Sequence, residues 1–206
     1  MDNPSLAKSD QLLRAGFRYL NRFMLLLWRL GLGSWLNLWP AVLGRYMVLV
    51  HRGRKSGLLR RTPVNYCIVD GEVYCVSGFG SVADWYRNLL AQPRVELWLP
   101  DGWWVGEATE ITEPSERLAR MRDALLGSGF AAYAAGIDPR RMSDRELDEL
   151  TRDYRVLHIT RTQARTGPDG PGDLAWVWPA VTQLLLAGAA LRGRRKRRIT
   201  HRPVRA

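Results

Sequence analysis

The stretch PVNYCIVDGEVYCVS, residues 63–77, predicts a β-hairpin. Two runs rich in apolar and β-branched residues flank Asp70 and Gly71, and this dipeptide is the strongest short signal for a two-residue hairpin turn. With two residues in the turn, Cys67 faces Tyr74, and neither cysteine faces the other. A disulfide between the two cysteines is therefore not expected.

Further strands and helices are predicted on both sides of this hairpin. Apolar alternation and turn residues predict strands at 46–51, 94–99, 103–112 and 154–160. Apolar residues three or four apart predict helices at 10–30, 83–91, 114–127 and 143–152. Most strands are joined by hairpins, which favours an antiparallel sheet over a parallel one. The sequence therefore predicts an α+β fold: an antiparallel barrel of about six strands with inserted helices and flanking N- and C-terminal helices.

Composition divides the chain into four parts. Residues 1–45 form an amphipathic and apolar N-terminal lead, and residues 46–161 form the barrel domain. Residues 162–173 are rich in Gly, Pro and Asp, as linkers are. Residues 174–206 are expected to form an apolar helix followed by a basic tail.

The positive charge is concentrated in the tail. The 206 residues carry a net charge of +11, and eight Lys and Arg residues lie within 192–206. Residues 1–173 hold 23 basic and 20 acidic residues, a net charge of only +3. A nucleic-acid-binding domain needs a basic face of its own, so no nucleic-acid partner is expected. Two cysteines and three scattered histidines do not form a metal-ligand motif, so no metal site is predicted.

Both ends of the chain favour contact with a membrane surface. Five of the nine Trp residues lie outside the barrel region, and the basic run follows an uncharged stretch at 174–191. A basic cluster beside an apolar helix is attracted to anionic lipid. Without a recognisable secretory signal, the expected location is cytoplasmic, peripheral on the inner face of the cell membrane. For residues 174–191, interfacial binding, a full span and a packed or disordered tail all stay open.

A basic loop lies between the first two predicted strands. Residues 53–61 read GRKSGLLRR and contain no acid. Their cations, together with glycines that let a ligand approach the backbone, suit a phosphate or a carboxylate. The alternative is a solvated loop with ordinary surface charges. The residues alone leave both interpretations open.

Residues with obvious catalytic chemistry are few. The sequence GFGSVA at 78–83 matches a dinucleotide fingerprint, but it follows a hairpin strand, and no series of βαβ units follows it. Asp84 is either a site residue or a helix N-cap. Tyr66, Tyr74 and Tyr133 are each either proton donors or packed aromatic residues. If the protein is an enzyme, a cofactor is expected to carry the difficult chemistry.

Two motifs together resemble the deazaflavin-dependent nitroreductase family, which includes quinone and nitroimidazole reductases. The first is G-R-x-S/T-G-x-x-R-x-x-P, matched by residues 53–63. The second is W-Y-x-N-L-x-A-x-P, matched by residues 85–93. The resemblance runs from about residue 20 to residue 161. It departs at Gly78, where relatives often have lysine, and at His51 and Arg52, where relatives usually have small residues.

The resemblance implies a split β-barrel that binds coenzyme F420, an 8-hydroxy-5-deazaflavin with an anionic tail; FMN is the alternative cofactor. It assigns the tail to the basic loop, the ring to the loop after the second hairpin strand, and closure over the cofactor to the Trp-Tyr segment. It also implies Ser77 and Tyr133 as the catalytic residues. The implied cofactor-binding residues are Arg54, Lys55, Ser56, Gly57, Arg60, Val76, Ser77, Gly78, Phe79, Asp84, Trp85 and Tyr86.

The implied activity is hydride transfer from F420H2 to a quinone, nitroaromatic or enone acceptor. The implied partners are this small-molecule acceptor and, through the tail, an anionic membrane surface; the protein is expected to be a monomer or a homodimer. An alternative of another class is a split barrel that binds a cofactor or a lipid without turnover. Because no recognisable acid–base motif is present, that alternative stays open.

Overall fold

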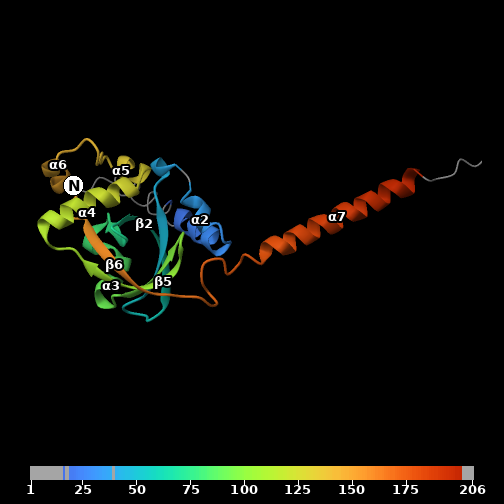
Figure 1. The fold of residues 1–206 in the computed structure, drawn as a ribbon, viewed down its shortest axis with the longest axis horizontal. Helices are drawn as coiled ribbons and strands as arrows, with labels where there is room; N and C mark the ends of the chain where they lie inside the picture. The colour runs from blue at the N-terminus through green and yellow to red at the C-terminus, as the bar shows by residue number, and fades with distance from the viewer. Residues whose placement is uncertain (1–15, 17–18, 39, 201–206) are drawn as a thin grey trace, which may run out of the picture.

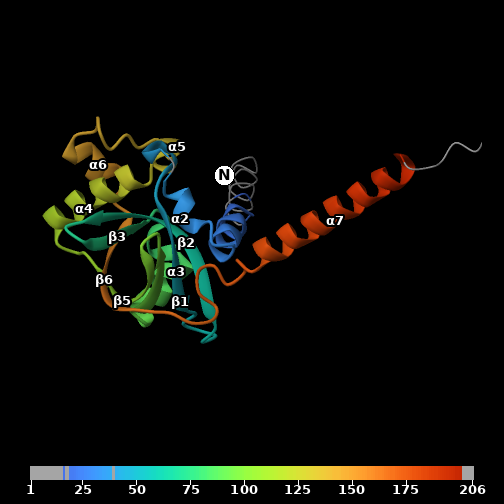
Figure 2. The same cartoon turned by 45° about the vertical axis from the view of Figure 1, so that its right-hand side comes forward.

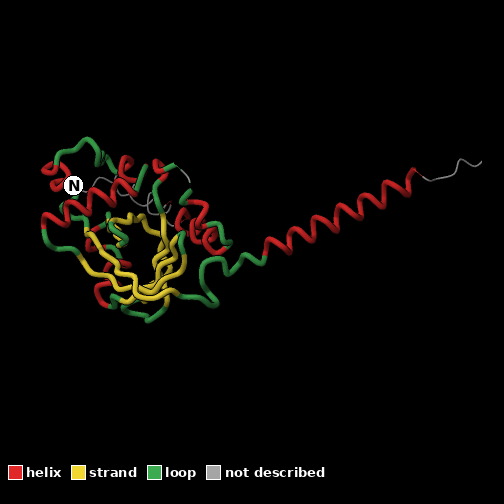
Figure 3. Tube along the Cα trace, viewed as in Figure 1, coloured by secondary structure: helices red, strands yellow, loops and turns green. Residues whose placement is uncertain are grey.

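Six antiparallel strands form a closed barrel in the computed structural model, which describes residues 16, 19–38 and 40–200. The strand order around the barrel is β1-β2-β3-β6-β5-β4, and Figure 3 shows the ring of strands with helices around it. This confirms the predicted α+β split barrel. The strands are β1 (Tyr46–Arg52), β2 (Leu59–Val69), β3 (Glu72–Ser77), β4 (Arg94–Leu99), β5 (Gly102–Glu110) and β6 (Arg155–Ala164).

The hairpin of β2 and β3 has the predicted register. Cys67 pairs with Tyr74 across the two strands. The turn residues Asp70 and Gly71 have φ of 52° and 84°, as a type I′ turn requires of both central residues. Both cysteines are free, with Cys75 buried in the barrel. The turn chemistry therefore fixed the pairing of the two strands.

Helices cover the outside of the barrel and close it. Helix α4 packs over β2 and β3, and Figure 1 shows it lying along the barrel wall. Its predicted bounds are confirmed, and α6 begins with the predicted capping box of Ser143 and Glu146. Besides the helix at 19–29, the described residues form α2 (Gly33–Leu36), α3 (Asp84–Ala91), α4 (Pro114–Gly127), α5 (Phe130–Ala134), α6 (Asp144–Leu150) and α7 (Val177–Thr200), with 3-10 turns η1 (Ala41–Leu43) and η2 (Gly80–Val82).

The barrel has an inner and an outer core. On β1, Met47 and Leu49 belong to the interior cluster, whereas Val48 and Val50 pack outward against Trp28 of the helix at 19–29. This alternation follows from the two-residue period of a strand. Helix α3 contributes Tyr86 and Leu89 to the same interior cluster. Helix α3 is thus part of the barrel core, which fixes its place beside β1 and β5.

Two strands are longer than the sequence indicated. Strand β2 begins at Leu59, because residues 59–62 pair with β1. Strand β6 continues to Ala164 by pairing with β5, so the segment expected to be a linker, 162–173, begins inside a strand. Residues 165–169 are exposed, and residues 170–173 pack against the barrel: Gly172 donates its N–H to the Trp28 carbonyl at 2.9 Å. The expected start of the linker at residue 162 was therefore too early, since polar residues at strand ends weaken the apolar pattern.

Each end of the chain lies partly outside the described residues. The helix predicted at 10–30 is helical over 19–29, and residues 1–15, 17 and 18 lie outside the described residues. Helix α7 extends away from the barrel in Figures 1 and 2. Among the helices of the described residues, none has the length and hydropathy that crossing a bilayer requires.

Candidate functional site

Hydrogen bonds and an ion pair connect the basic loop to helix α3, which carries the Trp-Tyr motif. Arg54 donates its backbone N–H to the Asn88 Oδ1 at 3.0 Å, and its Nη1 donates to the same oxygen at 3.0 Å. The same Nη1 forms an ion pair with the Asp84 Oδ1 at 3.0 Å. Two segments that the sequence assigned to one site, about thirty residues apart in the chain, therefore lie against each other.

Glycines set the shape of the basic loop. Gly53 donates its N–H to the Leu58 carbonyl at 2.9 Å and accepts from the Gly57 N–H at 2.7 Å. Gly57 has a φ of +66°, which side-chain-bearing residues rarely adopt. A Cβ at Gly53 would lie 2.8 Å from the Ser56 Oγ. The turn is therefore compact, and its backbone conformation depends on Gly57.

The outer residues of this loop face solvent. Lys55, Ser56, Gly57 and Arg60 are exposed. In the part of the chain that the structure describes, no ion pair involves Lys55 or Arg60. Two cations without an acidic partner, on a loop with exposed backbone, are arranged to accept an external anion.

His51 lies beneath the loop. It is 2% exposed, with its Nε2 3.1 Å from the Thr62 Oγ1 and its Nδ1 3.4 Å from the Asn88 Nδ2. Burial lowers the pKa of His51, a backbone hydrogen bond with Arg52 opposes this change, and the positive charge of Arg60 adds to it. The ring is therefore neutral near pH 7.

The three residues that begin α3 play different parts. Asp84 is exposed and pairs with Arg54, while the N-cap is Ala83, so the N-cap alternative for Asp84 was wrong. Trp85 is half-buried against the interior cluster. Tyr86 is buried, and its hydroxyl donates to the Glu110 Oε2 at 2.7 Å. Burial, followed by this hydrogen bond, raises the pKa of Tyr86 to about 12.

The loop after β3 is held in a tight bend. Ser77 is 1% exposed, and its hydroxyl donates to the Gly80 carbonyl at 2.9 Å. Gly80 has a φ of +57°, and a Cβ there would lie 2.2 Å from the Asp153 carbonyl oxygen. Gly78 and Phe79 are exposed, whereas Val76 packs with the cluster beneath α4. Of the residues assigned to the ring, Gly78 and Phe79 thus face the outside.

Tyr133 lies elsewhere. It belongs to α5 and lines a shallow cavity of about 100 Å³ with Leu126, Pro139 and Arg140 among its neighbours. Figures 1 and 2 show α5 at the top of the molecule and α3 below it. No hydrogen bond or ion pair of the described residues connects Tyr133 to Ser77 or to the basic loop. The structure therefore does not bring the two implied catalytic residues together.

Three residues of this region were not predicted as site residues: His51, Asn88 and Glu110. Asn88 stands inside the W-Y-x-N-L motif, which was the one signal for it. His51 was expected to be structural, and Glu110 ends a strand without any motif. The contacts between Tyr86 and Glu110 and between His51 and Asn88 join residues 24 and 37 positions apart, so periodicity and local spacing do not reveal them.

Two solved structures illustrate what the chain is similar to. A conserved hypothetical protein, Rv2991, from Mycobacterium tuberculosis is 19% identical, with a TM-score of 0.43, over 60% of this chain and 77% of that one. A structure named F420-H2 dependent reductase FDR-A is 23% identical, with a TM-score of 0.41, over 56% of this chain and 93% of that one.

The sequence match is more specific. The model of the family described as F420H(2)-dependent quinone reductase matches residues 35–142, slightly more than half of the chain. That range includes the basic loop, the bend after β3 and helix α3. The chain therefore belongs to the F420H(2)-dependent quinone reductase family and is an F420-dependent oxidoreductase with coenzyme F420 as its cofactor.

Proposed function

We propose that the protein reduces a quinone, or a related nitroaromatic or enone, with F420H2. The basic loop beside helix α3 would hold the F420H2. When bound, reduced F420 supplies a hydride from its deazaflavin ring. The observation that carries the proposal is the attachment of Arg54 to Asp84 and Asn88, because it sets the basic loop beside the Trp-Tyr segment.

The donor set fits the anionic part of this cofactor. Lys55 and Arg60 offer charged donors, and Ser56 and Gly57 offer a hydroxyl and backbone N–H groups at the same exposed turn. A phosphodiester and carboxylates accept from such groups. Arg54 already forms an ion pair with Asp84 of α3. Its proposed role is therefore to hold the basic loop in place, and it is not the main residue that binds the cofactor's tail.

The other residues would position the ring and exclude water. The exposed Phe79 and the half-buried Trp85 supply apolar surface for a flat molecule. In this proposal the Ser77 hydroxyl holds the bend, since its hydrogen is donated to Gly80, and solvent delivers the proton to the acceptor. Tyr133 lies outside this arrangement, and a catalytic part for it would require an acceptor that reaches α5.

A direct assay separates the proposal from the non-catalytic alternative. The full chain is mixed with reduced F420 and menadione, and the deazaflavin absorbance is followed, with FMN in a parallel reaction. Oxidation of F420H2 that requires the protein supports the reductase. Binding of F420 without oxidation favours a cofactor carrier, and turnover with FMN alone overturns the assignment of F420 to this loop.

We also propose that the reaction takes place on the inner, cytoplasmic face of the cell membrane. The helix at 19–29, α2 and the start of α7 expose apolar side chains, and eight basic residues lie within 192–206. Each basic residue near an anionic surface contributes roughly 1 kcal/mol. Membrane quinones would then be close acceptors. The exposed apolar residues include Tyr19, Phe23, Trp35, Leu38, Trp176 and Trp178.

Vesicle flotation tests this second proposal. The full chain should float with vesicles of phosphatidylglycerol and phosphatidylcholine at low salt, and not with phosphatidylcholine alone. A full-length variant with glutamine at all six basic positions of 192–198 should stay at the bottom. Glutamine at Arg140 and Arg141, exposed on the barrel domain, is the matched control. Equal flotation of both variants would remove the tail from the proposal.

A further inference from the structure

Asn88 connects the basic loop to the barrel through every polar atom of its side chain. It is 5% exposed. Its Oδ1 accepts from the Arg54 backbone N–H and from the Arg54 Nη1, both at 3.0 Å. Its Nδ2 lies 3.4 Å from the His51 Nδ1. The two donors of Arg54 fix which way the amide faces, because only its oxygen can accept.

The amide orientation determines the tautomer of His51. Because Nδ2 can only donate, the Nδ1 of His51 must accept, so the ring proton is on Nε2. That N–H then donates to the Thr62 Oγ1 at 3.1 Å. A doubly protonated ring would place a second N–H against the Asn88 amide hydrogens. The hydrogen bond from Asn88 therefore forms only when the Nδ1 of His51 carries no proton.

The charges around His51 favour the same state. Arg60 of β2 is the nearby cation that acts on the ring, and Arg54 of the loop shares Asn88 with it. Asp84 of α3 is paired with Arg54 and is 83% exposed in its side chain. The electrostatic influences on His51 from groups of the described residues come from Arg60 and the Arg52 backbone, and they include no carboxylate.

We propose that Asn88 is a positioning residue of the cofactor site, and that its hydrogen bonds to Arg54 and to neutral His51 hold the basic loop ready for an anion. The proposal rests on the proposed function, because it gives that loop its ligand. Asn88 touches Arg54 rather than the reacting atoms, so it acts through the position of Lys55 and Arg60. Neither His51 nor Asn88 was among the residues assigned to the site.

The Arg54 amide proton reports on this arrangement without cofactor. Its hydrogen is donated to the Asn88 side chain, so its protection from hydrogen exchange depends on residue 88. In the full chain followed by NMR, Asn88→Ala should abolish that protection while amides of the β4–β5 hairpin keep theirs. Asn65→Ala, which removes another half-buried amide bonded to a backbone carbonyl, is the matched control. Unchanged protection of Arg54 in Asn88→Ala would overturn the proposal.

Asn88→Asp adds a measurement of pH dependence. If Asn88 had only a structural role, this substitution would not change how the protection of Arg54 depends on pH. The carboxylate still accepts from Arg54, but it can also accept from a protonated His51. Protection of Arg54, corrected for the intrinsic exchange rate, should fall in the native chain as the pH drops below about 6.5 and His51 becomes protonated. In Asn88→Asp it should persist at the acid end. The same fall in both proteins would contradict the part given to His51. Because Asp matches Asn in shape, this variant stays informative if Asn88→Ala does not fold.

Cofactor binding completes the test. Fluorescence titration with F420 should give Asn88→Ala a dissociation constant about tenfold higher, as expected for loss of hydrogen bonds to a charged group. Asn65→Ala should leave it unchanged. If the native chain binds no F420, the proposed function fails, while the exchange experiment still decides the part of Asn88. If the native chain and Asn88→Ala bind equally, the positioning role fails and the proposed function stands.

Discussion

Tyr86 belongs to the Trp-Tyr motif, and its side chain packs in the core of the barrel. The resemblance assigns it to the cofactor, yet its side chain is buried with the barrel interior and its hydroxyl donates to Glu110. Glu110 also lies 3.8 Å from the Arg155 Nε, so this hydroxyl joins α3 to an ion pair between β5 and β6. Tyr86 therefore positions the helix that carries Trp85.

We predict that Tyr86→Phe lowers the free energy of unfolding by about 1 kcal/mol, because the hydrogen bond to Glu110 is lost while the ring still fills its place. F420H2 oxidation by the folded variant should be nearly unchanged. Urea unfolding and the absorbance assay measure the two quantities. Unchanged stability with a large loss of activity would return Tyr86 to the cofactor site.

His51 makes the stability of the fold depend on pH. Its pKa is lowered from 6.5 in the folded protein, so the folded state binds fewer protons than the unfolded one as the pH falls. The stabilisation is full above about pH 6.5 and is lost as the pH drops through that value towards the folded pKa. The difference in unfolding free energy between the native chain and His51→Gln should therefore shrink from about pH 7.5 to about pH 5.5. A constant difference in urea unfolding would show that His51 does not titrate in this range.

At the scale of the elements, local signals predicted more than long-range ones could. The Asp70-Gly71 turn and the Ser143 capping box act within a few residues, and both are confirmed. The start of β2 at Leu59 depends on pairing with β1, and the end of β6 depends on pairing with β5. The loop cations were found from composition, but their attachment through Asn88 spans 34 residues and has no local pattern.

The bend between β3 and α3 should be the least tolerant glycine position near the site. Gly80→Ala combines a φ of +57° with a Cβ 2.2 Å from the Asp153 carbonyl oxygen, so backbone must move. We predict a loss of about 1–3 kcal/mol in the free energy of unfolding. Gly136→Ala is the control, because its φ is +77° with nothing within 4 Å of the added carbon. Thermal unfolding should rank Gly80→Ala well below Gly136→Ala; equal melting temperatures would contradict the close approach.

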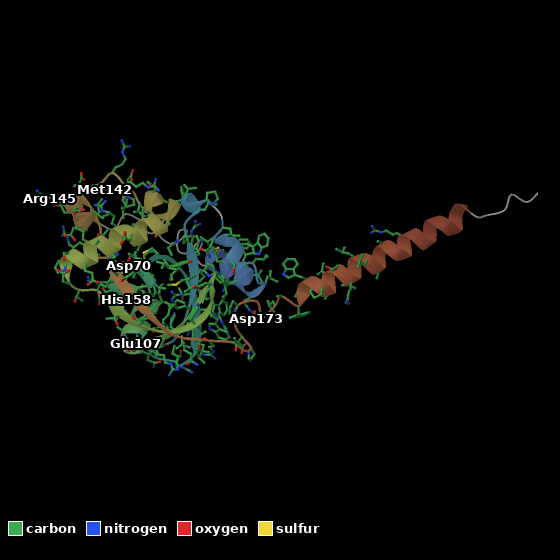
Figure 4. The ribbon with its side chains drawn as sticks, in the orientation of Figure 1. Asp70, Glu107, Met142, Arg145, His158 and Asp173 are labelled. Atoms are coloured by element: carbon green, nitrogen blue, oxygen red, sulfur yellow. The ribbon has the colours of Figure 1, made fainter. Side chains whose placement is uncertain are left out.

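At the scale of the whole molecule, the helix at 19–29 is joined to the segment that precedes α7. Arg29 donates from Nε and Nη2 to the Asp173 carboxylate, with the shortest contact at 2.8 Å. Figure 4 shows Asp173 between the barrel and the start of α7. Leu174 and Trp178 add hydrogen bonds to the carbonyls of Arg29 and Leu30. These contacts therefore hold the end of the N-terminal helix against the start of α7.

Asp173→Asn should weaken the contact between the N-terminal helix and the start of α7 without unfolding the barrel. The ion pair is only partly exposed, because the Asp173 side chain is 14% exposed, so solvent screens it incompletely. Loss of the Asp173 charge therefore weakens the contact. Hydrogen exchange should quicken at the amides of Gly172 and Leu174, whose acceptors are the carbonyls of Trp28 and Arg29, and stay slow in β4 and β5. Asp144→Asn, which removes another peripheral partner of an arginine, should leave those two amides protected. If both variants exchange alike, the N-terminal helix and the start of α7 are held together by packing rather than by this ion pair, and the surface proposed to face the membrane keeps its shape without Asp173.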